Sequence, residues 1–477
     1  MRGHLAAAPP IVAGTRLRWT GANAPKVVLP LLAALIAAGA VVAFPELSAV
    51  ACVVVWGIAA AWALPVRASI CVPLSLILLL PADHIVGLNG PMLGLFVFGA
   101  AMILFLSTLL RRPFLTQLRS DWDFLLLAGV LVSTTVLQSG RGEVRGVLFW
   151  VAACMMVYWF RSEERAAASP GRQIAFAFII AGSISSVVAI VDYIGLIASR
   201  DLLPRYAPVQ LDFVQFMGLR AVGMSGHPLR LGTLAMIASL IALAWLFDGR
   251  PTGRTRSALL ISLGLSLSGL ILSGARGSWL GFVLGYGVLG GLHWSRAALR
   301  RIGQMVLAIA ALGVLLVATG LWPIIYERLF GSAFHPGSIN QRLAALESVS
   351  IIWKEVPAFG VGFGGADELT QKAGLRLPNL ENEYLRLFLT AGVAGPLALL
   401  TLGARRIRTS LRSDPGPRRT AALAVIVSLF VNITTYNLFA WSCAPTLLVA
   451  AALLSQPSTP REGGKSSGKH EGRLADA

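Results

Sequence analysis

Three arginines stand in sequence settings that suit the binding of an anion. Arg220 begins a glycine-rich run, Arg276 has glycines close on both sides, and Arg342 lies on a segment with amphipathic helical spacing. Guanidinium groups stay protonated in proteins and can bind phosphate oxygens through two parallel hydrogen bonds. Phosphate or diphosphate is therefore the ligand that these residues suit best. For any one of them, an ordinary interfacial arginine or a solvated helix face remains an alternative.

A short acidic run, Glu381-Asn382-Glu383, precedes a long apolar stretch. Carboxylates in this position commonly cap a helix or interact favourably with its dipole. A carboxylate can also act as a general base that accepts a hydroxyl proton. The residues alone leave both interpretations open. His227 and His335 are isolated, and the four cysteines lie in apolar segments without ligand spacing, so neither a metal site nor a disulfide is expected.

The composition indicates an integral membrane protein. Hydrophobic residues make up 56% of the 477 residues and charged residues only 13%, and the mean hydropathy is +0.73. The formal net charge of +18 would suggest nucleic acid binding in a soluble protein, but most lysines and arginines flank apolar runs. Membrane topology explains the excess of positive charge, and no nucleic acid partner is expected.

Apolar runs of bilayer length predict an all-α fold, a polytopic membrane helix bundle of about 12–14 transmembrane helices. The weakest runs are 68–86 and 146–160, which are short or interrupted by proline. The predicted spans are 27–44, 47–66, 68–86, 91–110, 122–138, 146–160, 172–196, 229–247, 256–273, 277–293, 302–323, 383–402, 419–437 and 440–455.

Alternating the loops across a membrane places most basic clusters on one side, which the positive-inside rule identifies as the cytoplasm. Both termini are then predicted to be cytoplasmic. The basic N-terminus covers 1–26, the membrane domain 27–455, and a tail rich in Ser, Gly, Lys and Glu, expected to be disordered, covers 456–477.

The three arginines depart from this pattern, because each falls in a loop on the outer side. One outer loop, 324–382, is long, and its segment 338–353 has apolar residues spaced as in a short amphipathic helix. The glycine-rich segment 357–365 follows, where the backbone can approach a ligand closely. A site for an anion on the outer face is the expectation that follows.

The order of these motifs resembles the O-antigen ligase and O-antigen polymerase superfamily, over about residues 200–400. Ligases of that superfamily typically carry His-Asn, nine residues and Gly, and here glutamate stands in place of the histidine. This difference puts a polymerase slightly ahead of a ligase. The matching motifs are Arg220-x-x-Gly, Ser-Gly-Ala-Arg276-Gly between paired spans, Arg342 with Pro357-x-x-Gly-Val-Gly, and Glu381-Asn382 with Gly392.

The resemblance implies a membrane glycosyltransferase at the outer face of the bacterial cytoplasmic membrane. Its donor would be a glycan on undecaprenyl diphosphate, its acceptor another glycan or a lipid-linked core, and its surroundings membrane lipids, with no metal ion or cofactor. The arginines would bind the diphosphate and polarise it as a leaving group. The expected catalytic residues are Glu381 and Arg276, and the expected substrate-binding residues are Arg220, Arg342, Asn382 and Glu383.

A function of another class remains open, namely a multispan transporter or a flippase of lipid-linked oligosaccharide. Transporters commonly show internal repeats and ionisable groups near the middle of the membrane. This sequence shows no clear repeat, and its unexplained charges gather at one interface. These features favour the enzyme.

Overall fold

The structure of the chain is a computed structural model. The contacts within it divide the chain into two compact units, Met1–Pro65 and Val66–Ala477. The residues that the structure describes all lie in the second unit. They are 78, 122–137, 170–193, 221–225, 228–249, 251–292, 343, 346–362, 365–372, 374 and 382–435.

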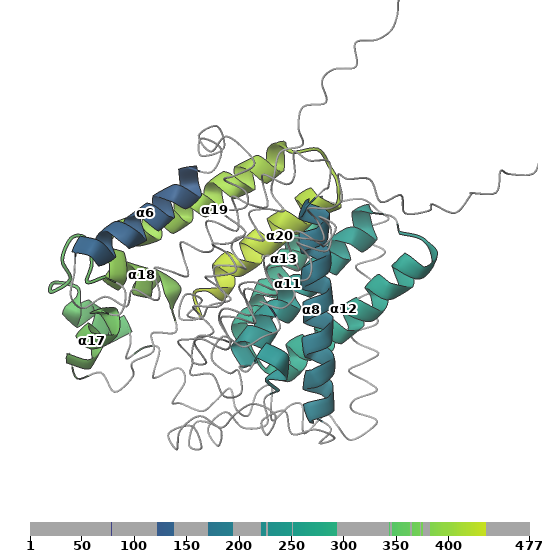
Figure 1. Ribbon diagram of the computed structural model, residues 1–477, viewed down its shortest axis with the longest axis horizontal. Coiled ribbons are helices and arrows are strands. Elements are labelled where there is room, and N and C mark those ends of the chain that lie inside the picture. The colour runs from purple at the N-terminus through teal and green to yellow at the C-terminus, as the bar shows by residue number, and fades with distance from the viewer. Residues whose placement is uncertain are drawn as a thin grey trace, which may run out of the picture. The chain divides into compact units, whose positions relative to one another are not determined.

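The described residues form helices and turns and no strand, which confirms the predicted all-α class. Figure 1 labels these helices along the chain. In chain order they are α6 (Trp122–Leu137), α8 (Pro170–Tyr193), the 3-10 helix η2 (Gly223–Ser225), α11 (Pro228–Asp248), α12 (Gly253–Ser273), α13 (Arg276–Leu292), α17 (Gly365–Lys372), α18 (Glu383–Ala391), α19 (Ala394–Arg412) and α20 (Pro417–Asn432).

Within the described part of the chain, α8, α11 and α12 are long and apolar enough to cross a membrane. Each coincides within a few residues with a predicted span, so the membrane helix bundle is confirmed. The helix count of about 12–14 stays a prediction, since seven of the fourteen predicted spans lie wholly or almost wholly outside the described residues.

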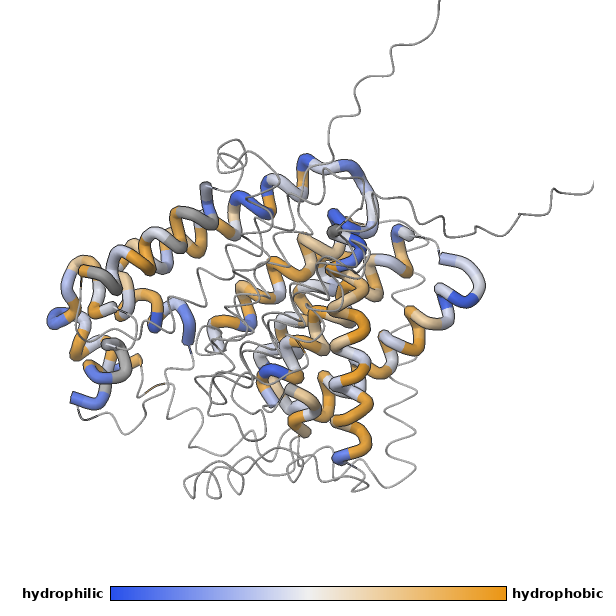
Figure 2. The backbone as a smooth tube through the Cα atoms, in the orientation of Figure 1, coloured by the Kyte–Doolittle hydropathy of each residue, from blue (hydrophilic) through white to orange (hydrophobic). Residues whose placement is uncertain are grey.

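Helix α11 lies at the centre of this bundle and packs against α8, α12, α13 and α20 (Figure 1). Its residues from Arg230 to Ala244 are all buried, as expected for a helix that is apolar around its whole circumference. Small residues permit the close packing, because Gly182 faces Ala238. The helices are apolar along most of their length, and hydrophilic residues gather near their ends (Figure 2).

Two hydrogen bonds fix the direction of α20 relative to α11. The side-chain amide of Asn432 donates to Oγ1 of Thr233 at 2.7 Å near one end. The hydroxyl of Thr420 donates to a carboxylate oxygen of Asp248 at the other end. The two helices are therefore antiparallel. We call the end where α11 and α13 begin the site end, and the end where α8, α12 and α20 begin the opposite end.

Helices α6 and α19 are joined by a buried cluster of charges. Asp123 has no exposed surface, and it accepts hydrogen bonds from Arg406 Nε at 2.7 Å and from Arg405 Nη1 at 2.6 Å. Arg406 binds both carboxylate oxygens, the strongest geometry for such a pair. The Arg405 guanidinium also lies 4.8 Å from the centre of the Trp122 ring. The beginning of α6 is thus held against the last turns of α19.

The predicted span 383–402 is wrong, because the structure divides it into α18 and α19. The break occurs at Gly392, whose φ of 61° lies in the left-handed region that favours glycine. A β-carbon at Gly392 would come within 2.0 Å of the carbonyl oxygen of Ala358. A hydropathy average over many residues does not detect a break at one glycine. The break follows from the close approach of the Ala358 backbone.

The described residues of 324–382 form a small hydrophobic core together with α18. Val349 and Ile352 pack with Leu389 of α18, and Val361, Leu369 and other partly buried residues surround them. Residues 346–352 are helical, in agreement with the amphipathic helix predicted at 338–353. The loop therefore packs onto α18 and holds it from the side.

Candidate active site

The candidate site lies at the site end, where three helices begin close to the last turn of α20. The backbone N–H of Glu383, first residue of α18, donates to the carbonyl of Ile433 at 3.0 Å. Gly277 in the first turn of α13 packs against Thr435, with space too small for a β-carbon. The N-termini of α11, α13 and α18 thus gather in one region. The positive ends of helix dipoles make such a region favourable for anions.

A tight turn between α12 and α13 places Arg276. Gly274 adopts a φ of 58°, and its N–H donates to the carbonyl of Ile271. The hydroxyl of Ser273 accepts from the N–H of Ala275 at 3.2 Å. Arg276 is then the first residue of α13, a helix with no acidic residue in its first turn, and its side chain is exposed. A cation at a helix N-terminus is locally unfavourable, so helix stability does not explain this position.

The segment that follows Arg220 is held beside this turn. The N–H of Ala221 donates to the carbonyl of Leu272 at 3.1 Å, and the N–H of Met224 donates to the hydroxyl of Ser185 at 3.2 Å. Arg220 itself lies outside the described residues, as do Arg342 and Glu381. Their roles as diphosphate ligands and base remain predictions.

Two of the predicted substrate-binding residues, Asn382 and Glu383, occupy different positions at the start of α18. Asn382 is the N-cap of the helix, and its side-chain oxygen accepts from the N–H of Leu385 at 3.2 Å. The capping role considered for the carboxylates is therefore filled by Asn382. Glu383 occupies the first helical position and is completely buried.

Two buried arginines at this end were missed in the sequence. Arg230 on α11 exposes only 7% of its surface, and Arg386 on α18 exposes only 9%. Arg386 lies three residues after Glu383 and so shares its side of the helix. Arg230 falls just inside the predicted span 229–247, and an ionisable residue inside a span is a recognised signal of function. That signal could have identified Arg230. Arg386 could not be identified from the sequence in this way, because its place depends on where α18 begins.

A buried polar network lies one helical turn deeper and joins α11, α13 and α20. Asn432 donates to Thr233 at 2.7 Å and accepts from the hydroxyl of Ser278 at 3.4 Å. All three residues are buried. A network with satisfied hydrogen bonds fixes neighbouring helices in one arrangement. Here it fixes the helices that carry Arg230 and Arg276.

The glycine-rich segment 357–365 contacts α18 near the end of that helix. The N–H of Val361 donates to the carbonyl of Leu389 at 2.8 Å, and the N–H of Gly362 donates to Thr390 at 2.9 Å. Gly360 has a φ of 74° and lies against the backbone of Thr390, where a β-carbon would not fit. The close approach that these glycines permit is therefore to α18. Among the described residues, no group of three His, Cys, Asp or Glu side chains could hold a metal ion.

Residues 261–400 match the model of the O-antigen ligase family. The matched segment contains Arg276, Asn382, Glu383, Arg386 and Gly392, and runs from α12 into α19. No curated protein matches the chain. The match agrees with the family predicted from the order of the sequence motifs, and with the all-α membrane bundle that carries them. Over residues 261–400, the chain is therefore similar to the O-antigen ligase family.

Proposed function

We propose that the chain transfers a glycan from undecaprenyl diphosphate to an acceptor hydroxyl at the outer face of the bacterial cytoplasmic membrane. The observation that carries this proposal is the gathering of three helix N-termini with Arg230, Arg276 and Arg386 at one end of a membrane bundle. Each element favours negative charge, and a diphosphate carries negative charge throughout the reaction. Polymerisation of a surface polysaccharide stands slightly ahead of ligation to a lipid-linked core.

In the proposed mechanism, the acceptor hydroxyl attacks the anomeric carbon of the donor sugar. A bond forms between that carbon and the acceptor oxygen, while the bond to the diphosphate oxygen breaks and its electron pair stays on the diphosphate. Arg276, together with Arg220 and Arg342, stabilises the charge that develops there. Glu381 accepts the hydroxyl proton, and Asn382 and Glu383 position the substrate. The arginines supply the positive charge, so this mechanism requires no metal ion.

The arrangement of the helices supports an outer location for the site. Helix α8 carries Arg172 at its start, and α20 carries Arg418 and Arg419 at its start, so these basic residues lie at the opposite end. The positive-inside rule then assigns the opposite end to the cytoplasm. In this orientation both termini, 1–26 and 456–477, are cytoplasmic, and 27–455 is the membrane domain.

The proposal is tested by incubating the purified full chain with a polyprenyl-diphosphate oligosaccharide and analysing products by gel electrophoresis and mass spectrometry. Longer glycan chains and free polyprenyl diphosphate are the expected products. Arg276→Ala should abolish them, whereas Arg254→Ala, an exposed arginine at the start of α12, should not. The absence of transfer to glycan or lipid-linked acceptors, with translocation of labelled donor by proteoliposomes, would instead identify a flippase.

A further inference from the structure

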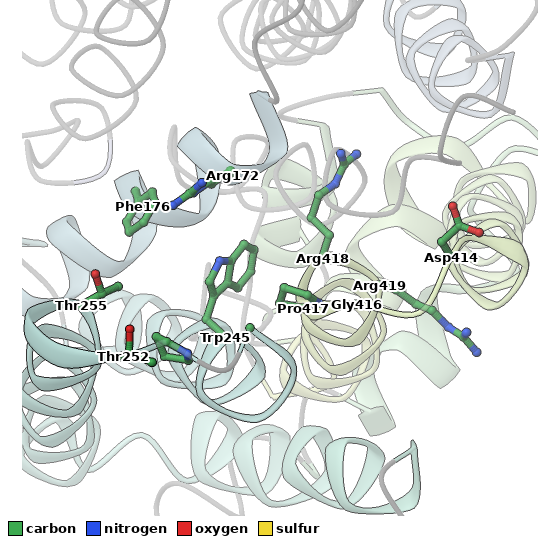
Figure 3. A pocket seen from close by; sticks show the side chains of 12 residues that line it. Arg172, Phe176, Trp245, Thr252, Thr255, Asp414, Gly416, Pro417, Arg418 and Arg419 are labelled. Atoms are coloured by element: carbon green, nitrogen blue, oxygen red, sulfur yellow. The ribbon is translucent and has the colours of Figure 1, made fainter. Parts of the chain in front are cut away.

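A cavity lies at the opposite end of the bundle, where α8, α12 and α20 begin and α11 ends. Its volume is about 550 Å³, and it opens between the first turns of these helices. Figure 3 shows Trp245 of α11 near the centre, with Arg172 and Phe176 on one side and Arg418 on another. The polar contact of Thr420 with Asp248 holds α20 against α11 next to this cavity.

The walls of the cavity carry a net positive charge. Its lining includes three arginines, Arg172, Arg418 and Arg419, and one carboxylate, Asp414. The first turns of α8, α12 and α20 hold no acidic residue, although acids are the residues that helix N-termini favour. The arginines therefore add their charge to the positive ends of three helices, and an anion in the cavity would interact favourably with all of them.

The side chains also form a built recess rather than a loose basic surface. Arg418 lies over Gly171 in the first turn of α8, so closely that a β-carbon there would be 2.7 Å from its Nε. The Arg172 guanidinium lies 5.6 Å from the centre of the Phe176 ring, which holds it in place. Arg254 and Arg256 on α12 are exposed, as Arg172 is, but unlike Arg172 they do not line the cavity.

The position of the cavity favours a ligand that is part lipid. It lies at the ends of α8, α11 and α12, the described helices apolar enough to span a membrane. Leu260 and Ile261 of α12 expose apolar surface one to two turns deeper. Trp245 and Phe176 are amphipathic or apolar rings at the level of the boundary, as is common at membrane interfaces.

We propose that this cavity binds the phosphate headgroup of an anionic phospholipid from the cytoplasmic leaflet. The assignment to the cytoplasmic side rests on the proposed function, whereas the binding chemistry does not. In this proposal the arginines bind the phosphate oxygens. Thr252 and Thr255 line the same recess at its rim. The acyl chains lie along α12.

Lipid titration of the purified full chain in detergent tests the proposal. The thermal midpoint is followed as dioleoyl phosphatidylglycerol, phosphatidylcholine or inorganic phosphate is added at equal phosphate concentration. Phosphatidylglycerol should raise the midpoint, and the other two should not. The double variant Arg172→Gln/Arg418→Gln should weaken the apparent affinity for phosphatidylglycerol by about tenfold or more. The matched control Arg254→Gln/Arg256→Gln should change it by about threefold or less at about 0.15 M salt, because these arginines lie outside the cavity and act on it only through screened charge.

A second variant avoids any effect on folding. Thr255→Glu places a carboxylate on the exposed rim of the cavity, at a helix position that favours acids, and should also weaken lipid binding. Equal losses in the two arginine pairs, or no loss in Thr255→Glu, would overturn the cavity as the site. Stabilisation by inorganic phosphate equal to that by phosphatidylglycerol would overturn the lipid as its source. None of these readouts depends on glycan transfer, so their failure is distinct from failure of the proposed function.

Discussion

The two ends of the bundle share an arrangement of helix N-termini and arginines, and they differ in the acidic residues that accompany it. At each end three helix N-termini meet, and arginines stand in the first turns of most of them. Of the six helices involved, α18 alone has an acidic residue in its first turn, the buried Glu383. At the opposite end the arginines are accompanied by Asp414 on a connecting loop and by aromatic rings.

This difference separates binding from chemistry. Positive charge and helix dipoles are sufficient to hold a phosphate group, and both ends supply them. Transfer to a hydroxyl also requires a proton acceptor, and among the described residues the site end has the carboxyl group of Glu383 where α18 begins. It also has the Asn432 network, which fixes its helices below the arginines. The comparison therefore predicts catalysis at one end and lipid binding at the other.

The largest expected effect is an all-or-none difference in labelling between the two sides. In a chain with its four native cysteines replaced by alanine, Phe359→Cys tests the outer loop, where Phe359 is 63% exposed. Thr252→Cys tests the opposite end. A membrane-impermeant maleimide should label Phe359→Cys in intact cells and Thr252→Cys only after permeabilisation. Labelling of both in intact cells would contradict the proposed orientation.

Glu381→Gln should reduce the rate of transfer by a factor of about 10² to 10⁴, the usual cost of losing a general base. The N-cap of α18 is Asn382, so the variant should remain folded and bind donor. Initial rates per folded molecule, compared with Glu383→Gln and with the exposed Glu355→Gln, measure the effect. Glu383→Gln should be milder. Near-normal turnover in Glu381→Gln would show that Glu381 is not the base and would make Glu383 the next candidate.

Asp123→Ala should lower the free energy of unfolding by about 3–5 kcal/mol, because it leaves two arginines without their buried carboxylate. The matched control is Glu368→Gln, which removes the exposed pair with Lys372 and should cost about 1 kcal/mol or less. Denaturation in detergent measures both. Equal destabilisation by the two variants would show that the buried cluster does not hold α6 to α19.

Arg276→Lys should reduce transfer by about 10², because an ammonium group cannot reproduce the paired hydrogen bonds of a guanidinium. Arg254→Lys at the opposite end is the matched control and should leave transfer unchanged. Both variants keep the charge, so membrane insertion should be normal. Full activity in Arg276→Lys would mean that charge alone acts at this position.

Several parts of the fold and the site follow from local sequence. The spans α8, α11 and α12 are predicted by hydropathy because each is a continuous apolar run of bilayer length. Arg276 is found by its glycines, since the turn that places it is made by neighbouring residues.

Other parts depend on contacts between distant residues. Gly392 breaks a helix because the backbone of Ala358 lies against it, and no local pattern reports that approach. The pairing of Asp123 with Arg406 spans 283 positions along the chain. The position of Arg386 depends on where α18 begins. Asn382 caps that helix, and a hydrogen bond from Glu383 to Ile433 holds its start against the end of α20. Local sequence therefore predicts helices better than it predicts which of their side chains meet.

The smallest expected effect comes from the network beneath the site end. Thr233→Val removes the 2.7 Å partner of the Asn432 amide and leaves a buried donor unsatisfied, so it should cost about 1–3 kcal/mol in unfolding free energy. Asn432→Leu should cost less, because the Thr233 hydroxyl keeps its hydrogen bond to the carbonyl of Leu229 at 2.8 Å. The double variant should be close to Asn432→Leu alone, since the amide that Thr233→Val would leave unsatisfied is already gone. Thermal unfolding of the three variants, arranged as a double-mutant cycle, measures this coupling. Additive losses would mean that the network joins α11 and α20 without energetic coupling, and that the arginines above it are positioned by helix packing alone.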